Sequence, residues 1–585
     1  MIDRIKELWR ELRQRRVVGA AAAYAAVAFV ALQLSEILFP AFGLEPSAIR
    51  LLLGALLAGF PVVLAFSWVY DVTRTGLKRT DAGGSGSGLA PIVMTVGVVA
   101  SGAGLGLLGW WAIRGVGEGD SRPVSESSIA VLPFVDLSEG GDQAYLGDGL
   151  AEEILNVLAG VGDLHVAART SAFAFRDASQ DIRDVGRQLG VATVLEGSIR
   201  RDQRRVRITA QLIDAETGFH LWSNTYDREV RDLFQVQDEI AGSIVGALLG
   251  QLDITGRSTS RHVAPPEAQE AYWQGRAQWN RRDAAGIPGA LRLFERALTL
   301  DPEYPEAYAG LADAYALLPL FVTGMDPDVA TSHAEAAALK AIELDPTLAE
   351  PYASLGLVRA LERDRAGALA SFGQALELNP SCAPALHWRA NVLADMGQLE
   401  AAVRDVEKAA RLDPLSPAIA SDMGRILLWS GQVDAAEAAF DAALQLDFRF
   451  PPALYGRALV ALERNEPVPL QMAFAQWAAV SGLAPSLAGQ LAEAMVEYRR
   501  TGVPGDVPLG LQSLEAGGAP VSAGTVAALH ALVGSRDGAV RWLRRSVEDR
   551  SWVDQYLAVN PVYDGLRTDP GFLEVITEVS RPEGE

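Results

Sequence analysis

Residue types that commonly carry catalysis or bind metals are sparse in this sequence, and their spacing fits neither task. No two of the six histidines follow the H-x-x-x-H spacing, and none neighbours the single cysteine, Cys382. One cysteine allows neither an internal disulfide nor a cysteine-based zinc site, so we expect Cys382 to be a packing residue in a helix. Motifs for phosphate binding (G-x-x-x-x-G-K-[ST]) and for a serine nucleophile are also absent. We therefore predict no catalytic residue, no cofactor and no metal, and a protein that is not an enzyme.

Two further stretches have the form of ligand chemistry but a better structural interpretation. Gly104 to Gly109 reads G-x-G-x-x-G, yet no strand precedes it and apolar residues surround it, which disfavours a dinucleotide site. Gly102 and Gly106 could let membrane helices pack closely, although ordinary span composition explains them as well. The pair Glu152-Glu153 would point about 100° apart on a helix, which suits solvent better than a shared substrate.

Two polar clusters lie in the middle of the chain. The run from Tyr145 to Gly149 precedes a predicted helix, where backbone amides can bind an anion; alternatively, the glycines shape a turn and Asp148 caps the helix. Five arginines crowd one predicted hairpin turn, where either solvent or an anionic surface could face them: Arg200, Arg201, Arg204, Arg205 and Arg207.

The elements that must position these residues are organised around a short repeated phrase. Leu-Asp-Pro or a close variant begins at positions 300, 344, 378, 412 and 446, so the steps are 44, 34, 34 and 34 residues long. This period resembles that of the tetratricopeptide repeat, a helix-turn-helix unit that stacks on its neighbours. We expect the longer step to hold about ten extra residues, Leu318 to Asp328, in the turn between its two helices.

Small and large residues recur in phase with that period. Gly356 falls on a first helix, and Ala368, Phe372 and Ala375 fall on the second, which are positions where paired helices approach and an aromatic ring fills the gap. The next unit has Val406 at the aromatic position. The resemblance implies repeats over residues 265–480, then degenerate helical repeats and a carboxyl-terminal cap over residues 481–585.

The amino-terminal part predicts a membrane anchor. Residues 1–16 form a basic amphipathic helix, and residues 17–113 contain three hydrophobic stretches at about 17–38, 51–70 and 89–113. Each stretch is long enough to cross a bilayer. Lys and Arg are concentrated in the first segment and in the loop after the second span, which places both in the cytoplasm. We therefore expect a multi-pass protein of a bacterial inner membrane whose carboxyl-terminal domains lie in the periplasm.

Residues 114–127 read as a linker, and residues 128–250 predict a small α/β domain with a mixed sheet. Ser128 to Phe134, Tyr145 to Glu153, Leu195 to Ser198 and Leu212 to Asp214 resemble the module related to the amino-terminal domain of the translocation protein TolB. That resemblance implies a partnership with tetratricopeptide repeats that also occurs beside adenylate cyclase or winged-helix domains. Only about sixteen residues precede the first predicted span, so we expect neither of those domains here.

The predicted fold is therefore multidomain, with transmembrane helices, an α/β domain and an all-α repeat superhelix. A formal charge of −22 disfavours nucleic acid as a partner. The expected function is a membrane-anchored scaffold or adaptor that binds a protein or peptide segment in the repeat groove, with Arg359, Arg389 and Asn391 as candidate contacts. The alternative is a non-catalytic sensory receptor related to the cyclase-associated repeat proteins. The oligomeric state stays open.

Overall fold

The structure is a computed structural model. It describes residues 70–73, 76–79, 127–139, 143–162, 164–176, 180–202, 205–229, 233–249, 262, 264–281, 283–321, 326–483, 485–506, 508, 511–512, 521–548 and 556–579. The chain divides into two compact units, Met1–Pro123 and Val124–Glu585. Within the first unit, β1 (Tyr70–Thr73) and β2 (Gly76–Arg79) pair antiparallel.

The predicted basic helix and the predicted membrane spans fall on residues outside the described ranges, apart from the end of the second span at Tyr70. Among the helices that are described, none has both the length and the apolar character that crossing a membrane requires.

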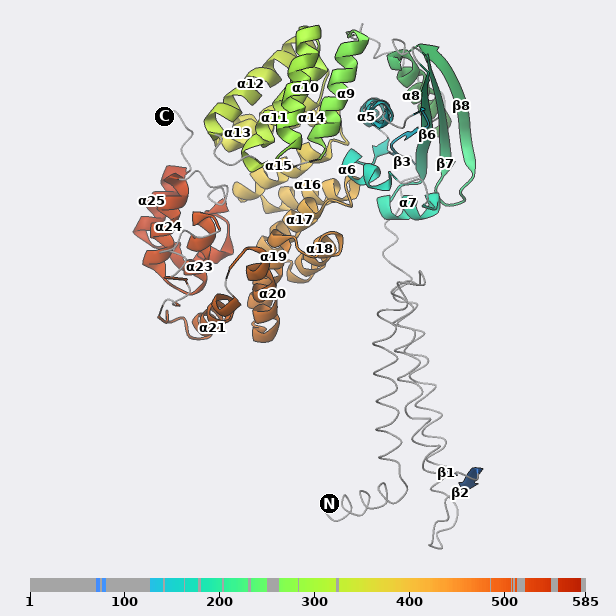
Figure 1. Cartoon of the computed structure of the whole chain (residues 1–585). Helices are drawn as coiled ribbons and strands as arrows, with labels where there is room; N and C mark the ends of the chain where they lie inside the picture. Colours follow the sequence, from blue (N-terminus) through green and yellow to red (C-terminus); the bar gives the residue numbers. More distant parts are fainter. Residues whose placement is uncertain are drawn as a thin grey trace. The chain divides into compact units, whose positions relative to one another are not determined.

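The second unit begins with a mixed sheet, as the sequence predicts (Figure 1). The strand order is β5-β3-β6-β7-β8, and β4 also pairs with β6. β3 lies parallel to both β5 and β6, whereas β6, β7 and β8 form an antiparallel meander. The strands are β3 (Ser128–Val131), β4 (Val135–Asp136), β5 (His165–Val166), β6 (Thr193–Asp202), β7 (Arg205–Asp214) and β8 (His220–Glu229).

Helices cover both faces of this sheet. α5 (Ala144–Ala159) and α8 (Leu233–Leu249) share one apolar cluster with β3, β6 and β7. The opposite face packs against α6 (Arg169–Ala172), the 3-10 turn η1 (Phe173–Phe175) and α7 (Ile182–Leu189). The helix α6 has only four residues, too few to show a helical periodicity in the sequence.

The helix pairs predicted from the Leu-Asp-Pro phrase follow the sheet domain. They are α9 (Pro266–Trp279), α10 (Gly286–Leu300), α11 (Pro305–Phe321), α12 (Pro327–Leu344), α13 (Glu350–Leu361), α14 (Arg365–Leu378), α15 (Ala383–Asp395), α16 (Leu399–Leu412), α17 (Pro417–Trp429), α18 (Val433–Leu446), α19 (Pro451–Glu463) and α20 (Pro467–Val480). The prediction for the longer step was wrong in detail. Most of its extra residues lengthen α11 and α12 to 17 and 18 residues, against 12 and 14 in α13 and α14.

The repeated Asp or Asn ends each second helix and turns the chain. Its side chain accepts a hydrogen bond from the backbone N–H two residues later at Asp301, Asp345, Asn379 and Asp447, over 2.9 to 3.2 Å. Such Asx turns fix the direction in which the next first helix departs. The fifth turn, at Asp413, is different and is described below.

A phenylalanine packs against the facing glycine in several repeats, in agreement with the predicted phase. A Cβ added to Gly356 would lie 2.6 Å from the ring of Phe372, and one added to Gly456 would lie 2.2 Å from the ring of Phe440. Both rings are almost fully buried. The small residue is therefore required by the close approach of the two helices rather than by backbone conformation.

The chain after α20 contains α21 (Pro485–Thr501), α23 (Ala523–Leu532), α24 (Arg536–Glu548), the 3-10 helix η5 (Pro561–Leu566) and α25 (Pro570–Val579). The predicted degenerate pair corresponds to α23 and α24. The predicted cap corresponds to η5 and α25, which bury Tyr563 and Phe572 against α23 and α24.

We predict that Gly356→Ala lowers the free energy of unfolding by about 1–3 kcal/mol, because the new methyl group overpacks the Phe372 contact. Gly373→Ala on the neighbouring helix α14 is the matched control, since no atom lies within 4 Å of its added Cβ. The control should be neutral or stabilising. Denaturant unfolding of both variants measures the difference, and equal stability would contradict the packing argument.

Candidate functional site

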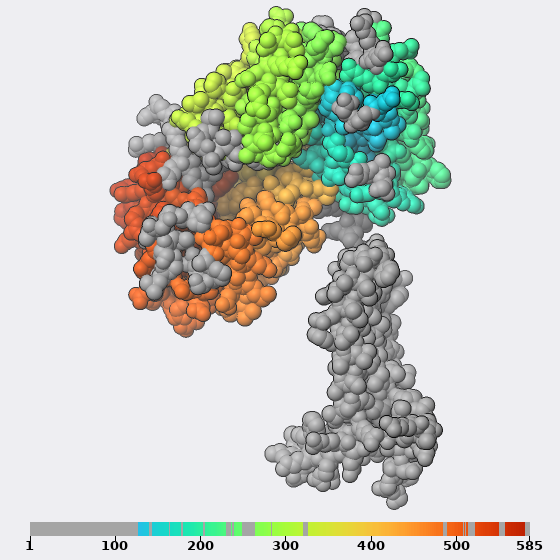
Figure 2. Space-filling model, viewed as in Figure 1, coloured from blue at the N-terminus to red at the C-terminus, as the bar shows by residue number. Residues whose placement is uncertain are grey.

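First helices of successive repeats contact one another in the order α9, α11, α13, α15, α17 and α19. In a superhelix of stacked repeats this row lines the concave inner face, where partner segments usually bind. In this protein α5 of the α/β domain contacts α9, the first helix of the row, and Figures 1 and 2 show the α/β domain beside the first repeats. The candidate binding face is thus partly covered by the chain itself.

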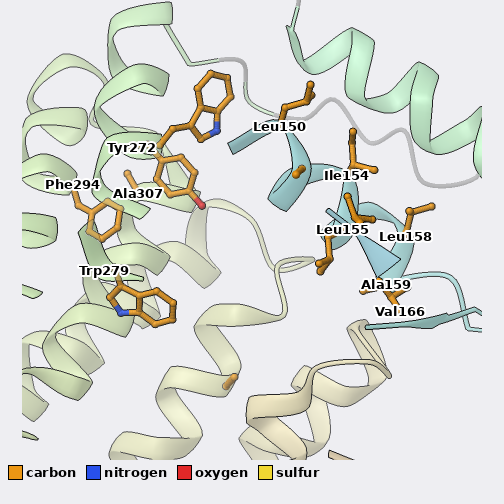
Figure 3. Packing of buried hydrophobic residues seen from close by; sticks show 14 of the residues in the cluster. Leu150, Ile154, Leu155, Leu158, Ala159, Val166, Tyr272, Trp279, Phe294 and Ala307 are labelled. Carbon is orange, nitrogen blue, oxygen red and sulfur yellow. The ribbon is translucent and has the colours of Figure 1, made fainter. Parts of the chain in front are cut away.

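The apolar part of this contact joins α5 to α9. Leu150 and Ile154 of α5 belong to the same buried cluster as Tyr272 and Trp273 of α9, and Figure 3 shows the α5 side chains beside those of the repeats. A Cβ at Gly149 would lie 2.5 Å from the Trp273 ring. The sheet domain and the repeats therefore share one hydrophobic core.

The turn and the capping role predicted for the run from Tyr145 to Gly149 were wrong, whereas the anion site stays a prediction. The helix α5 begins at Ala144, so the two glycines lie inside it rather than in a turn before it. Gly147 allows contact with the backbone oxygen of Phe134, which an added Cβ would approach to 2.2 Å. Asp148 does not cap the helix; it accepts two hydrogen bonds from Arg176, at 2.8 and 2.7 Å.

A buried ion-pair network crosses the same interface. Glu152 of α5 accepts a hydrogen bond from Arg169 Nε at 2.9 Å and one from Arg276 Nε of α9 at 2.8 Å. Arg276 also contacts Asp313 of α11 at 3.0 Å, and Asp313 accepts a hydrogen bond from Ser354 of α13. Four elements from two domains are thereby linked through charged side chains that are at most 14% exposed.

The network keeps Glu152 ionised. Burial by itself would raise the pKa of this carboxyl group, but the charges of Arg276 and Arg169 outweigh that effect and the pKa is lowered. For Arg276, burial opposes the charged form, yet Glu152 and Asp313 raise its pKa well above the ordinary value. The prediction that Glu152 and Glu153 face solvent was therefore wrong: both side chains are buried, and Glu152 is a structural ion.

At Asp413 the α/β domain takes part in a repeat turn. Thr170 and Ser171 of α6 each donate a hydrogen bond to the Asp413 carboxylate, over 2.5 Å. Ser171 Oγ also accepts from the backbone N–H of Leu415 at 2.8 Å, the bond that the Asx side chain makes in the other four turns. The backbone N–H of Ala168 adds a bond to Leu412 O at 2.6 Å. The hydroxyl of Ser171 thus replaces one internal bond of the turn.

A polar cluster occupies the middle of the inner row. Asp422 of α17 lies 2.7 Å from His387 Nε2, and it accepts from Asn391 Nδ2 at 3.0 Å and from Arg425 at 2.9 Å. Arg425 stacks on the rings of Trp429 and Tyr556, with 4.6 and 4.3 Å to the ring centroids. Since Tyr556 precedes the cap, the carboxyl-terminal part of the chain closes over the inner face from the other end.

The three predicted contact residues lie in two different environments. Arg359 donates to Ser371 Oγ at 2.8 Å and Arg389 donates twice to Asp405, so each is tied to the second helix of its own repeat. Asn391 lies in the Asp422 cluster. Cys382 lies immediately before α15 and not inside a helix, but it packs, partly buried, against the core of the repeats as predicted. Burial raises the pKa of its thiol to about 12.

Sequence reasoning missed Arg276, Asp313, Asp422 and Arg425. A usable signal was present for two of them, because Asp313, Asn391 and Arg425 occupy the same place in their repeats once the 44-residue step is allowed for. This shared repeat position indicates which residues line the inner face of the first helices.

The comparisons with known proteins agree with this architecture. The tetratricopeptide repeat family matches residues 393–462. A putative adenylate cyclase 3 of Rhizobium meliloti is 43% identical over 32% of this chain and 32% of its own length. The transcriptional regulator HilA of Salmonella paratyphi A is 28% identical over 24% of this chain and 26% of its own length. This chain therefore spans about a third or less of those relatives.

Among solved structures, a thermophilic tetratricopeptide repeat protein of Thermus thermophilus is 26% identical, with a TM-score of 0.27, over 33% of this chain and 97% of that chain. The helix pairs within residues 393–462 are tetratricopeptide repeats. Repeats of this kind define a class of protein-interaction scaffolds, and this chain combines them with a small mixed-sheet domain.

We predict that Glu152→Gln lowers the free energy of unfolding at neutral pH by about 3–5 kcal/mol, because Arg169 and Arg276 then stay buried without their shared anion. The folded pKa of Glu152 lies below its ordinary 4.5, so this stabilisation is present above that value and is lost as the pH falls through the folded pKa. The difference between the wild type and the variant should therefore shrink below pH 4.5.

Denaturant unfolding at a series of pH values measures this difference. Asp227→Asn is the matched control, because it removes an exposed ion pair with Arg207 and should leave stability unchanged. A Glu152→Gln variant as stable as the wild type at neutral pH would show that the network does not hold the two domains together.

Proposed function

We propose that this protein is a scaffold anchored in a bacterial inner membrane, with its α/β domain and repeats outside the cytoplasm. The anchor is supported by the three apolar stretches within residues 17–113, and the orientation by the distribution of Lys and Arg around them. The α/β domain, whose residues resemble the TolB-related module, would act as a fixed part of the scaffold. The shared core and the Glu152 network support that role, because they join it to the repeats.

The partner in this proposal is a protein or peptide segment bound by the repeats. The contacts described above do not extend the α/β domain over the Asp422 cluster or over the helices beyond it. This part of the inner face is therefore the proposed binding region. Asn391 is the proposed contact residue that lies there, whereas Arg359 and Arg389 would act at its edge.

A second candidate is a non-catalytic receptor that passes a signal across the membrane. The observation in its favour is the similarity of part of the chain to a putative adenylate cyclase, an enzyme class that acts in signalling. Co-purification of a cytoplasmic effector would favour this candidate over a passive scaffold.

The orientation has a direct test. Alkaline phosphatase and green fluorescent protein are fused in turn after Gly119 and after Glu585 in a bacterial host. We predict active phosphatase and dark fluorescent protein at both sites, because folding of each reporter depends on the compartment. Fusions after Gly88, in the predicted cytoplasmic loop, are the control and should give the opposite result. Fluorescence at Glu585 would contradict the periplasmic placement.

The binding face has a separate test in living cells. We predict that a photo-crosslinking amino acid at position 391 captures a discrete partner, whereas the same group at position 404 does not. Arg404 is exposed on α16, a second helix, and makes no hydrogen bond or ion pair among the described residues. Capture at position 404 alone would move the partner to the outer face of the repeats.

A further inference from the structure

A cavity of about 650 Å³ lies where the cap meets the second half of the inner row. Its lining comes from α17, the start of α18, α19, α21, α23, the start of α24 and η5. The apolar side chains are mostly aliphatic and include Leu428, Leu459, Leu462, Met495, Leu532 and Leu566. A volume in this range suits a drug-sized ligand rather than a long segment of chain.

The charged side chains of the lining are paired internally, with one exception. Glu463 pairs with Arg499 at 2.7 Å, and Asp564 pairs with Arg567 at 3.0 Å. Asn560 accepts from the backbone N–H of Val562. Arg536, exposed at the first residue of α24, has neither a hydrogen bond nor an ion pair within the described part of the chain. The cavity therefore offers one unpaired positive charge beside an aliphatic wall.

This arrangement of apolar and charged side chains disfavours a peptide as the ligand of the cavity. Each buried peptide unit brings one donor and one acceptor, and leaving them without partners costs free energy. The charged side chains of the lining other than Arg536 are paired, so the side-chain groups left to serve a peptide are few: the Tyr498 hydroxyl, the Trp429 indole N–H and the Asn560 amide nitrogen. A ligand with a long apolar body and a single anionic end has no such requirement, and its charge matches the unpaired Arg536.

We propose that this cavity binds a long-chain aliphatic carboxylate, such as a fatty acid. The hydrocarbon chain lies against Leu459, Leu462 and Met495, and the carboxylate pairs with the guanidinium of Arg536. Because the lining comes from both the repeats and the cap, the bound chain bridges them. The site adjoins the Asp422 cluster through Trp429, whose ring also stacks on Arg425, but its ligand is a different one from the protein or peptide segment proposed for that cluster.

The test uses the full chain in membrane nanodiscs and hexadecanoate that carries a photoreactive diazirine on its hydrocarbon chain. Expected labelling lies on α19, α21 and α23, as mapped by mass spectrometry. Unlabelled hexadecanoate should compete for these adducts, whereas hexadecanol, which lacks the charge, should compete at least about tenfold less well, as expected for one lost charge-assisted contact.

Three variants complete the design. Arg536→Gln should raise the half-saturating concentration of the probe about tenfold. Arg545→Gln, on the same helix but outside the lining, should leave it unchanged. Leu459→Trp fills the cavity from its half-buried wall and should abolish cavity labelling. The proposal is overturned if Arg536→Gln binds as well as the wild type, if adducts avoid the lining, or if the tripeptide acetyl-Leu-Leu-Leu competes better than hexadecanoate.

Discussion

The carboxylate of Glu152 is the interaction on which the arrangement of the second unit depends. It lies between two buried guanidinium groups, one from its own domain and one from the first repeat. Two like charges in a region of low polarity repel each other unless an anion lies between them. The α/β domain and the repeats therefore cannot separate without exposing this charge set and the apolar surface of α5. Their relative position is fixed by electrostatics as well as by packing.

This arrangement changes how the repeats should be viewed as a binding surface. A bare superhelix offers its whole inner face to a partner. Here α5 contacts α9, the first helix of that face, α6 contacts the turn at Asp413, and the region around Arg425 contacts Tyr556 from the other direction. Each occupant is a segment of the chain with its own hydrogen bonds to the repeats. The intact protein thus offers a partner only a short central region of the inner face. Which partners it binds depends on the covered parts of that face as well as on the exposed part.

Much of this fold was predictable from the sequence, because repetition amplifies weak signals. A single Leu-Asp-Pro phrase is a weak signal, but five of them locate the five helix pairs from α9 to α18. Gly356 with Phe372 gives the packing between paired helices. The strands of the α/β domain were predictable from their apolar alternation. The membrane spans remain a prediction, since they fall on residues that the structure does not describe.

The candidate site was less predictable, because it is made by contacts between distant segments. The turn α6 has four residues and no periodicity, yet Thr170 and Ser171 complete the Asp413 turn. Arg359 and Arg389 were chosen as charged residues on first helices. Repeat phase alone does not show that such side chains bend back to Ser371 and Asp405. Asn391 and Arg425 occupy the same position in successive repeats, and this shared position was the sequence signal that indicated the inner row.

The bond between Ser171 and Asp413 spans 242 residues, which has a consequence for biosynthesis. At about 5–20 residues per second, a ribosome needs roughly 12–48 s to reach Asp413 after it has made Ser171. The α9 partner of Glu152 is 124 residues away and emerges sooner. Docking during translation therefore proceeds in two stages, first against the opening repeat and then at the distant turn. In the interval, the nascent α6 lacks its final partner and is a natural target for chaperones.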